Sequence, residues 1–510
     1  VSFKDDIEKI GFASGLRLVI HKEERHMKFS SFYPPAAYRF TAVFDKPSRQ
    51  QHFYNEDFTD FNEDCLPAPL HPFNSVWDLK NTANLRKSHF NSCQMPQIGK
   101  IHQNGNKNVL TARCTDGTRP LFSYNRNAKE HQWTKVDDTG TELSQDWVFV
   151  KCKAVSTLQL LFFPRPLPHP KSNSFNVLLL QIDALSNSAM HRFYPITERL
   201  LKKKQPFTTA DVFSYTRYNS VGYNSPPNMK AIYCAQESCS SKHGVIKHFN
   251  AAGYTSIFLE DYWNRYPDIG EKYTSRILTN GLLPQYGSDV VHLYHRNPNP
   301  GCKDGGWMGR RMIKYIRDSM FDGMGSKRKG FLAVANFLEA HSYDPLRGSL
   351  DQSLSSFLNE LEQTDRLRNT IIMIYSDHGF HHANWPLHIQ KFEHRNPTLH
   401  VIIGKNVQHP SVTRDVAARN RNKLISSFDL NAAMINLANP SESTTGANFL
   451  GTALLENRTC KDARISPKWC NCWKFQKNKK KLTTPISRDE YKLFLKKTYR
   501  PQPILNRTLF

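Results

Sequence analysis

The sequence predicts an α/β protein in which helices lie on both faces of a mixed or parallel sheet. Between about residues 173 and 455, strand-like apolar runs alternate with stretches whose apolar residues recur at helical spacing, the pattern of strands joined by crossover helices. Residues 176–182 and 371–374 are almost continuously apolar, as expected of strands that are buried on both faces. An acidic residue follows each run closely, and open α/β sheets place their sites at the carboxyl ends of strands.

An aspartate and a histidine stand side by side behind the second run, as Asp377 and His378. Adjacent carboxylate and imidazole groups suit a divalent cation that takes both oxygen and nitrogen ligands. An isolated Asp-His pair is more often a turn with a capping aspartate, so the pair alone does not predict a metal site. Two polar residues upstream change that balance.

The two upstream residues are Asp183, at the end of the first run, and Ser225, in a proline-containing turn before an expected helix. Asp183 either lies at the tip of a strand or caps a helix expected through His191 to Lys204. Ser225 either presents its hydroxyl at the positive end of a helix macrodipole or is simply an N-cap ahead of Pro226. The residues alone leave both alternatives open.

Together, the order Asp, Ser, Asp-His resembles the alkaline phosphatase and sulfatase superfamily. The turn 225–228, Ser-Pro-Pro-Asn, resembles the Thr-Phe-Pro-Asn nucleophile turn of its nucleotide pyrophosphatase/phosphodiesterase branch. The wider pattern resembles an animal extracellular family called domain of unknown function 229, and it covers roughly residues 60 to 475. Its flanking motifs recur at residues 65–67, 147–152, 253–254, 260–261 and 460–472.

The resemblance implies an alkaline-phosphatase-like fold and a metal site, with one or two divalent ions, Zn or Mn. The implied metal ligands are Asp183, Ser225, Asp377 and His378. Ser225 is also the implied nucleophile, since a bound cation lowers the pKa of a hydroxyl and activates it near neutral pH.

Three further residues are implied to bind substrate or a second metal: His341, His388 and Asn228. His341 follows the apolar run 331–338 and matches a histidine that touches the transferred group in relatives. The match at His388 is loose, because four other histidines crowd this region and a histidine-rich surface loop explains them equally well. These are His381, His382, His394 and His400.

Three departures from the family pattern shape the expected activity. Ser225 stands where relatives usually carry threonine, Met229 stands where sulfatases need arginine, and Ala184 follows Asp183 where sulfatases tend to pair two carboxylates. We therefore expect a metal-dependent hydrolase or phosphotransferase acting on phosphoesters, with phosphodiesters the favoured class. The alternatives are a non-catalytic ectodomain that keeps the fold to bind a ligand or partner and, less favoured, a sulfate-ester hydrolase.

The chain is strongly basic, with 69 Lys and Arg against 45 Asp and Glu and a formal net charge of +24. Such a surface concentrates anionic ligands, so we expect a phosphorylated small molecule, a lipid headgroup or a glycan as partner. Specific nucleic-acid binding is disfavoured, because the basic residues are spread along the chain and no recognised nucleic-acid-binding motif accompanies them.

Ten cysteines and the sequons at Asn457 and Asn506 indicate a secretory route. We expect an extracellular, secretory-pathway or cell-surface ectodomain, with any signal peptide or membrane anchor outside this sequence. Cys234 and Cys239 are close enough for a local bridge, and disulfides explain Cys460, Cys470 and Cys472 better than a zinc ribbon does.

Three parts are predicted along the chain. Residues 1–170 read as a mainly β appendage stapled by disulfides, and a proline-rich linker at 164–170 separates it from the next part. Residues 173–455 form the predicted alkaline-phosphatase-like catalytic domain, and residues 456–510 form a basic, cysteine-containing tail.

Overall fold

The structure is a computed structural model. It describes residues 98–203 and 206–235 apart from short gaps, 244–260, 306–321, 330–341, 348–380 and 393–473. It also describes the short strands β1 (Leu16–Lys22), β2 (Tyr38–Phe44), β3 (Leu66–Pro67), β15 (Arg276–Ile277) and β16 (Cys302–Lys303). No helix in these ranges is long and apolar enough to cross a membrane.

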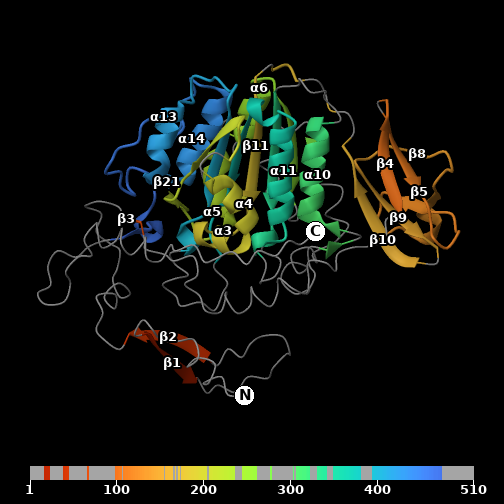
Figure 1. Ribbon diagram of the computed structural model, residues 1–510, viewed down its shortest axis with the longest axis horizontal. Helices are drawn as coiled ribbons and strands as arrows, with labels where there is room; N and C mark the ends of the chain where they lie inside the picture. Colours follow the sequence, from red (N-terminus) through yellow and green to blue (C-terminus); the bar gives the residue numbers. More distant parts are fainter. Residues whose placement is uncertain are drawn as a thin grey trace, which may run out of the picture.

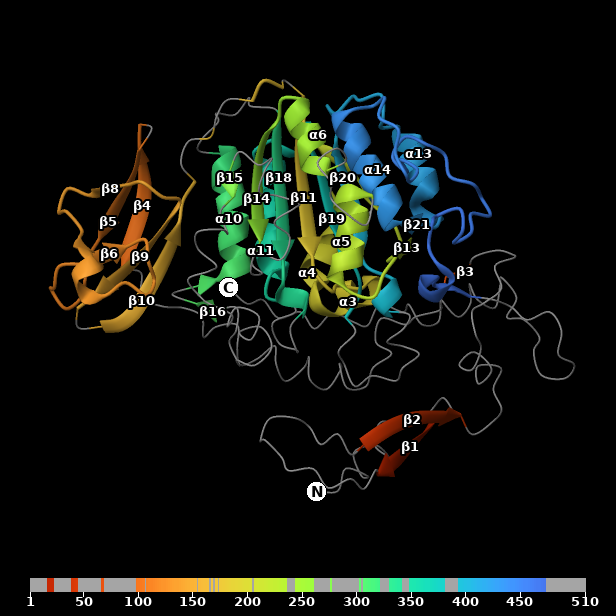
Figure 2. The same ribbon diagram turned by 180° about the vertical axis from the view of Figure 1, so that it is seen from behind.

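A seven-stranded mixed sheet forms the centre of the molecule (Figures 1 and 2), with the strand order β12-β20-β19-β11-β18-β14-β15. The strands from β19 to β15 are parallel to one another, whereas β20 runs antiparallel to both of its neighbours. The longer strands are β11 (Asn176–Ile182), β12 (Ala210–Ser214), β14 (Thr255–Glu260), β18 (Phe331–Phe337), β19 (Thr370–Tyr375) and β20 (Leu399–Gly404). Every residue of β11, β18 and β19 is buried, as their apolar sequences predict.

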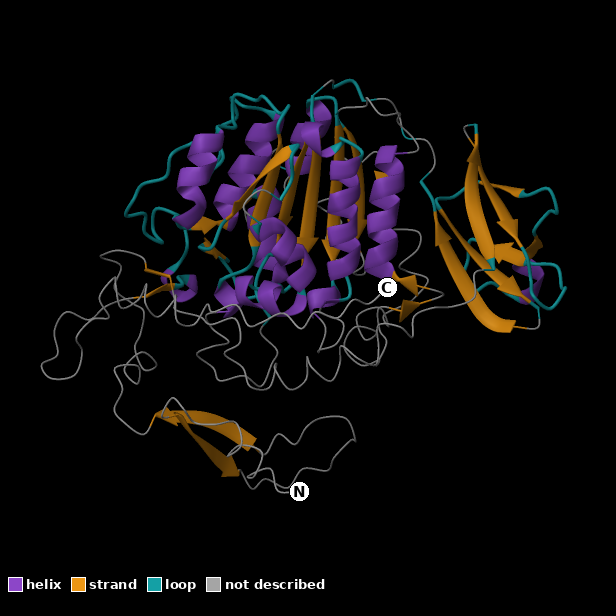
Figure 3. Cartoon of the chain, viewed as in Figure 1, coloured by secondary structure: helices purple, strands orange, loops and turns teal. Residues whose placement is uncertain are grey.

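Helices cover both faces of this sheet (Figure 3) and divide its core into two layers. Alternate residues of β11 enter different layers: Leu178 and Leu180 pack on one side, Val177 and Leu179 on the other, because successive strand side chains point to opposite faces. One layer contains α3 (Asn187–Phe193), α4 (Pro195–Lys202), α10 (Met308–Phe321) and α11 (Asp351–Gln363). The other contains α5 (Ser225–Cys234), α6 (Val245–Ala251) and α14 (Ser427–Ala438), with the short helix α13 (Arg414–Arg419) close by.

The predicted α/β class with a helix-covered mixed sheet is thereby confirmed. One local prediction was wrong: the single helix expected through His191 to Lys204 is two helices that meet at Tyr194. Pro195 explains the break, because its ring cannot continue a helix from the preceding turn but is well suited to the first position of a new one.

The described part of the N-terminal region is mainly β, as predicted, and lies beside α10 (Figure 1). Its two sheets have the orders β10-β9-β6-β7 and β4-β5-β8. The strands are β4 (Gly99–Asn104), β5 (Lys107–Ala112), β6 (Leu121–Ser123), β7 (Thr134–Lys135), β8 (Thr141–Leu143), β9 (Trp147–Cys152) and β10 (Val155–Phe162), with a 3-10 turn at Glu130–Gln132. A disulfide joins Cys114, just after β5, to Cys152 at the end of β9.

The described tail, up to residue 473, packs on the main domain. It carries a disulfide between Cys460 and Cys470, which confirms the predicted disulfide chemistry for that pair. Remaining short elements are β13 (Tyr218–Asn219), β17 (Gly306–Trp307), β21 (Ile425–Ser426), β22 (Cys472–Trp473) and 3-10 turns at Glu339–His341, Leu367–Asn369, Asn420–Asn422 and Pro467–Trp469. Cys234 is disulfide-bonded, and Cys239, its predicted partner, lies outside the described residues.

Candidate active site

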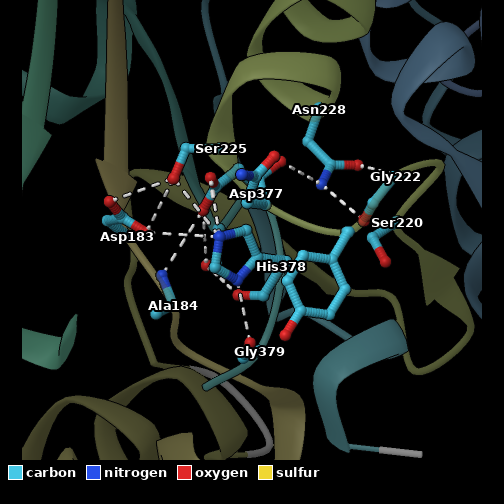
Figure 4. A network of polar contacts seen from close by, with 12 residues as sticks. Asp183, Ala184, Ser220, Gly222, Ser225, Asn228, Asp377, His378 and Gly379 are labelled. Atoms are coloured by element: carbon cyan, nitrogen blue, oxygen red, sulfur yellow. Dashed lines mark hydrogen bonds and ion pairs between the residues drawn. The ribbon is translucent and has the colours of Figure 1, made fainter. Parts of the chain in front are cut away.

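Strand register brings the two aspartates of the candidate site together. β11 and β19 are parallel neighbours, and Gln181 pairs with Tyr375. Asp183 and Asp377 each lie two residues beyond that pair. Both therefore follow the carboxyl ends of neighbouring strands and lie close together (Figure 4). Asp183 is also fixed to β18, since its backbone amide donates to the carbonyl of Phe337 at 2.9 Å.

The turn after Asp183 is held in an unusual backbone conformation. Ala184 has a φ of 61°, a left-handed conformation that costs a residue with a Cβ free energy and that clusters at functional sites. Its amide lies 3.4 Å from Oδ1 of Asp377, to which it donates. The N-cap of the following helix α3 is Ser186, whose hydroxyl accepts from the amide of Ala189 at 2.9 Å. Asp183 is therefore at the strand tip and is not the helix cap.

Ser225 is the first residue of α5, and Asn224 occupies the N-cap position. Ser225 is therefore not the N-cap of this helix, which was one of its two predicted roles. The serine Oγ lies 3.4 Å from each carboxylate oxygen of Asp183 and 3.2 Å from Nε2 of His378. Because α5 has ten residues, the positive end of its macrodipole favours negative charge at this oxygen.

His378 presents one ring nitrogen to this cluster and uses the other to fix its orientation. Nδ1 lies 2.8 Å from the carbonyl oxygen of Gly379, and a carbonyl only accepts, so Nδ1 carries the proton and donates. Nε2 then carries no proton and presents its lone pair to the cluster. It lies 3.5 Å from Oδ2 of Asp377 and 3.8 Å from Oδ1 of Asp183.

The donor atoms are spaced as metal ligands are spaced. Two ligands that each lie about 2 Å from a tetrahedral ion are roughly 3.3 Å from one another, and the separations above run from 3.2 to 3.8 Å. Oδ2 of Asp377 is buried and makes no hydrogen bond within the described structure. A buried carboxylate oxygen without a partner is costly, and a cation would supply the missing partner. The residues present therefore fit a divalent ion.

The described residues contain one other group of potential ligand atoms, formed by Cys114, Asp116 and Cys152. Its two cysteines are joined in a disulfide, so their sulfurs are not available as thiolate ligands. The group at Asp183, Asp377 and His378 is the one in the described ranges that fits a cation.

Asn228 forms hydrogen bonds with the turn that leads into Ser225 (Figure 4). Its side chain is fully buried, and its oxygen accepts from the amides of Val221 and Gly222 at 2.8 and 3.0 Å. Its amide nitrogen donates to the carbonyls of Gly222 and Asn224, both at 2.9 Å. The side-chain oxygen and nitrogen of Asn228 are thus both engaged in hydrogen bonds with the turn itself.

The structure describes one of the two other predicted histidines, His341. His341 ends the 3-10 turn after β18, and its ring packs edge-to-face on Phe380, 6.2 Å away, just beyond His378. His388 lies outside the described residues.

Buried phenols lie behind the candidate site. Burial raises the pKa of Tyr218, Tyr233 and Tyr375, and the charge of Asp377 raises each pKa further. All three therefore stay neutral at physiological pH. The hydroxyls of Tyr233 and Tyr375 lie 2.6 Å apart and hydrogen-bond to each other, which satisfies both inside the core.

Sequence reasoning missed the residues that support His378 from behind. The ring of His394 packs edge-to-face on that of His378, with centroids 5.3 Å apart, and the Gly379 amide donates to the carbonyl of His394 at 2.8 Å. The neighbouring Glu393 forms a buried, two-bonded ion pair with Arg192 on α3. A histidine in an apparent surface loop gave no signal for this, because the contact depends on the tertiary fold.

The Asp, the Ser and the Asp-His pair define an α/β protein whose candidate site lies at the carboxyl ends of two parallel strands and at the start of a helix. A family model described as "Protein of unknown function (DUF229)" matches residues 292–490. Residues 292–490 are thus similar to that family, whereas the resemblance was expected over roughly residues 60 to 475. The matched region includes His341, Asp377 and His378, whereas Asp183 and Ser225 precede it. No curated protein matches the sequence.

Several solved structures are similar to this chain. A protein in the alkaline phosphatase superfamily from Vibrio parahaemolyticus is 15% identical, with a TM-score of 0.36, covering 54% of this chain and 68% of that one. The C-terminal periplasmic domain of EcEptC from Escherichia coli is 11% identical, with a TM-score of 0.36, covering 58% and 96%. The lipoteichoic acid synthase LtaP from Listeria monocytogenes is 11% identical, with a TM-score of 0.34, covering 55% and 76%.

Proposed function

We propose that this protein is a metal-dependent phosphoester hydrolase or phosphotransferase, with Ser225 as nucleophile and phosphodiesters as the favoured substrate class. The observation that carries the proposal is the position of the Ser225 oxygen, within 3.4 Å of Asp183 and 3.2 Å of His378. This hydroxyl belongs to the same cluster of donor atoms as the candidate metal ligands, at the N-terminus of a helix.

Asp183, Asp377 and His378 would hold a divalent ion, Zn or Mn. When bound, such an ion lowers the pKa of a neighbouring hydroxyl and neutralises phosphate charge. The choice between one and two ions, and the roles of His341 and His388 as substrate or second-metal residues, belong to the same proposal. Asn228 serves here as a positioning residue, since its hydrogen bonds shape the turn that carries Ser225.

The chain's own residues supply the positioning that phosphoryl transfer needs. The Ser225 hydroxyl donates to Asp183, so this partly exposed carboxylate gives its proton a route to solvent. The Ser225 oxygen then forms a bond to phosphorus in line with the bond that breaks, and the leaving alkoxide takes a proton from water to depart as an alcohol. Water or an acceptor hydroxyl attacks the resulting phosphoserine and frees Ser225, which regains its proton.

The strongly basic chain, with a formal charge of +24, supports an anionic substrate such as a phosphorylated small molecule, a lipid headgroup or a glycan, met in an extracellular or secretory setting. Electrostatic attraction raises the encounter rate of such ligands. The proposal does not include a sulfatase, since Met229 stands where the formylglycine motif requires arginine.

The test is turnover of p-nitrophenyl phosphate, bis-p-nitrophenyl phosphate and p-nitrophenyl sulfate by protein loaded with Zn or Mn. We expect Ser225→Ala to lower phosphodiester turnover by at least about 10³-fold, because the covalent step is lost, and Ser225→Thr to retain part of it. Ser355→Ala, a buried serine on α11 away from the strand edge, is the matched control and should leave turnover unchanged.

Three results separate the alternatives. Stoichiometric metal with turnover that depends on Ser225 supports the proposal. Correct folding without metal and without turnover of any ester would instead identify a non-catalytic ligand-binding ectodomain. Preferential sulfate hydrolysis, together with a mass change in the Ser225 peptide, would identify a sulfatase.

A further inference from the structure

A row of aromatic rings leads away from the candidate metal ligand His378 and reaches the surface. The His394 ring packs edge-to-face on His378 at 5.3 Å, and Tyr223 and Trp469 pack on His394 at 5.2 and 5.7 Å. Tyr223 and Trp469 also contact each other, with centroids 5.9 Å apart. We call Tyr223, His394 and Trp469 the aromatic wall.

The wall combines three distant parts of the chain and is held rigidly. Tyr223 stands two residues before Ser225, and Nε2 of His394 donates to the carbonyl of Tyr223 at 2.5 Å. Trp469 comes from the tail, where the disulfide between Cys460 and Cys470 closes its loop. The side chain of Asn219 donates to the Trp469 carbonyl at 2.9 Å. Rings held in this way lose little entropy when a ligand binds.

Among the described residues, Tyr223 is unusually exposed for an aromatic side chain. Its exposed fraction is 53%, and the other large apolar side chains exposed in the described ranges, Ile196 and Leu455, are aliphatic. Trp469 is half-buried. A ring that served only to pack the core would be buried. An exposed aromatic side chain beside the candidate metal ligands and Ser225 instead points to a surface that binds a ring of a ligand.

Two cations flank the wall on the Trp469 side. The guanidinium carbon of Arg395 lies 5.6 Å from the Trp469 ring centroid, and the ammonium of Lys468 lies 5.7 Å from it. Nη1 of Arg395 donates to the Cys470 carbonyl at 3.3 Å, whereas its Nε makes no hydrogen bond in the described part of the chain. A flat ring beside fixed positive charge favours a planar group attached to an anion.

We propose that the aromatic wall is a subsite for a planar ring carried by the phosphoester substrate next to its phosphorus. The ring stacks on Tyr223 and is bordered by Trp469, while the phosphoryl group reaches Ser225, two residues further along the chain. This inference rests on the proposed function and narrows its substrate class to phosphoesters that bear an aryl or heteroaryl ring.

The experiment is a binding measurement that does not depend on turnover. Calorimetry on metal-loaded protein compares phenylphosphonate, cyclohexylphosphonate and methylphosphonate. Because a planar ring stacks on an aromatic side chain and a cyclohexyl or methyl group does not, we expect phenylphosphonate to bind at least about fivefold more tightly than the other two. Tyr223→Ala should remove this preference, Tyr223→Phe should keep it, and Trp469→Ala should reduce it.

Leu455→Ala is the matched control, since Leu455 is also exposed, at 68%, and takes no part in the wall. It should leave the preference unchanged. Equal binding of phenyl and cyclohexyl groups would overturn the planar-ring assignment, and a preference that survives Tyr223→Ala would overturn the location.

The two proposals fail in different ways. A ring preference that depends on Tyr223 in a protein that hydrolyses no ester keeps the subsite and removes the enzymatic proposal. Turnover that depends on Ser225 with no ring preference keeps the enzyme and removes the subsite.

Discussion

His378 donates its Nδ1 proton to the carbonyl of Gly379, the next residue, at 2.8 Å. This bond fixes both the tautomer and the direction of the ring, so that Nε2 faces Asp183, Asp377 and Ser225. A metal-binding histidine needs such a partner for its other nitrogen, because that partner holds the lone pair toward the ion.

Metal binding should stabilise the fold, since the ligand atoms are gathered in the folded state alone. We expect Zn or Mn at 100 times its dissociation constant to stabilise chelator-treated protein by about 2.7 kcal/mol. The measurement is thermal denaturation of the chelated protein with and without added ion.

His378→Ala should remove most of this response, because it deletes one of the four proposed ligands. Control protein with His131→Gln, a change at an exposed histidine of the N-terminal unit, should respond as the wild type does. An identical melting temperature with and without ion in the wild type would show that the cluster binds no metal.

Gly379 should tolerate no side chain. A Cβ at this position would collide with the backbone carbonyl of Glu393 and crowd the Cα of His394, and backbone cannot move as easily as a flexible side chain. We expect Gly379→Ala to lower the free energy of unfolding by about 1–3 kcal/mol and to weaken metal binding, since the carbonyl that orients His378 would shift. Urea denaturation and a metal titration test this.

The matched change is Gly244→Ala. A Cβ at Gly244 would meet nothing within 4 Å, so this variant should be neutral or slightly more stable. Equal stability of the two variants would mean that the approach of Gly379 to Glu393 is not tight.

The buried pair of Arg192 and Glu393 should be among the most sensitive ion pairs described. The two side chains are 1% and 2% exposed and share hydrogen bonds of 2.7 and 2.8 Å. We expect Glu393→Gln to cost about 3–5 kcal/mol of unfolding free energy, because it leaves a buried charge without its partner. Urea denaturation measures the loss.

An exposed pair of similar length provides the comparison. Lys107 and Glu142 also lie 2.7 Å apart, but their side chains are 64% and 56% exposed, so Glu142→Gln should cost less than about 1 kcal/mol. Comparable losses from the two substitutions would contradict the role assigned to burial.

The strand-edge site was predictable because two local patterns determine it. Residues 176–182 and 371–374 are apolar enough to be recognised as buried strands. The polar residues directly after them must lie at the carboxyl ends of those strands. The register of Gln181 with Tyr375 then makes Asp183 and Asp377 neighbours. The sequence predicts that these two strands are parallel, but only the structure shows which of their residues pair.

The aromatic wall could not be predicted, because none of its contacts is local. In the sequence, Trp469 lies 75 residues from His394 and farther from Tyr223. The neighbouring hydrogen bond between Arg395 and Cys470 spans the same 75 residues. Its place depends on the disulfide between Cys460 and Cys470, and connectivity among ten cysteines cannot be read from sequence. The hydrogen bonds of Asn228 to its own turn were likewise hidden, since a motif match gives residue type but not direction.

Acid sensitivity should come in part from His400. This histidine of β20 is buried and hydrogen-bonds to Ser214 at 2.8 Å and to Thr398 at 3.1 Å. Burial lowers its pKa from 6.5 to about 4. As the pH falls below 6.5, the unfolded chain therefore binds a proton that the folded protein does not. Stability should decline between pH 6.5 and about 4, by up to roughly 3 kcal/mol from this residue. His400→Gln should flatten the decline in urea denaturation measured across this range, whereas His131→Gln should not, and equal slopes in all three proteins would exclude His400 as the source.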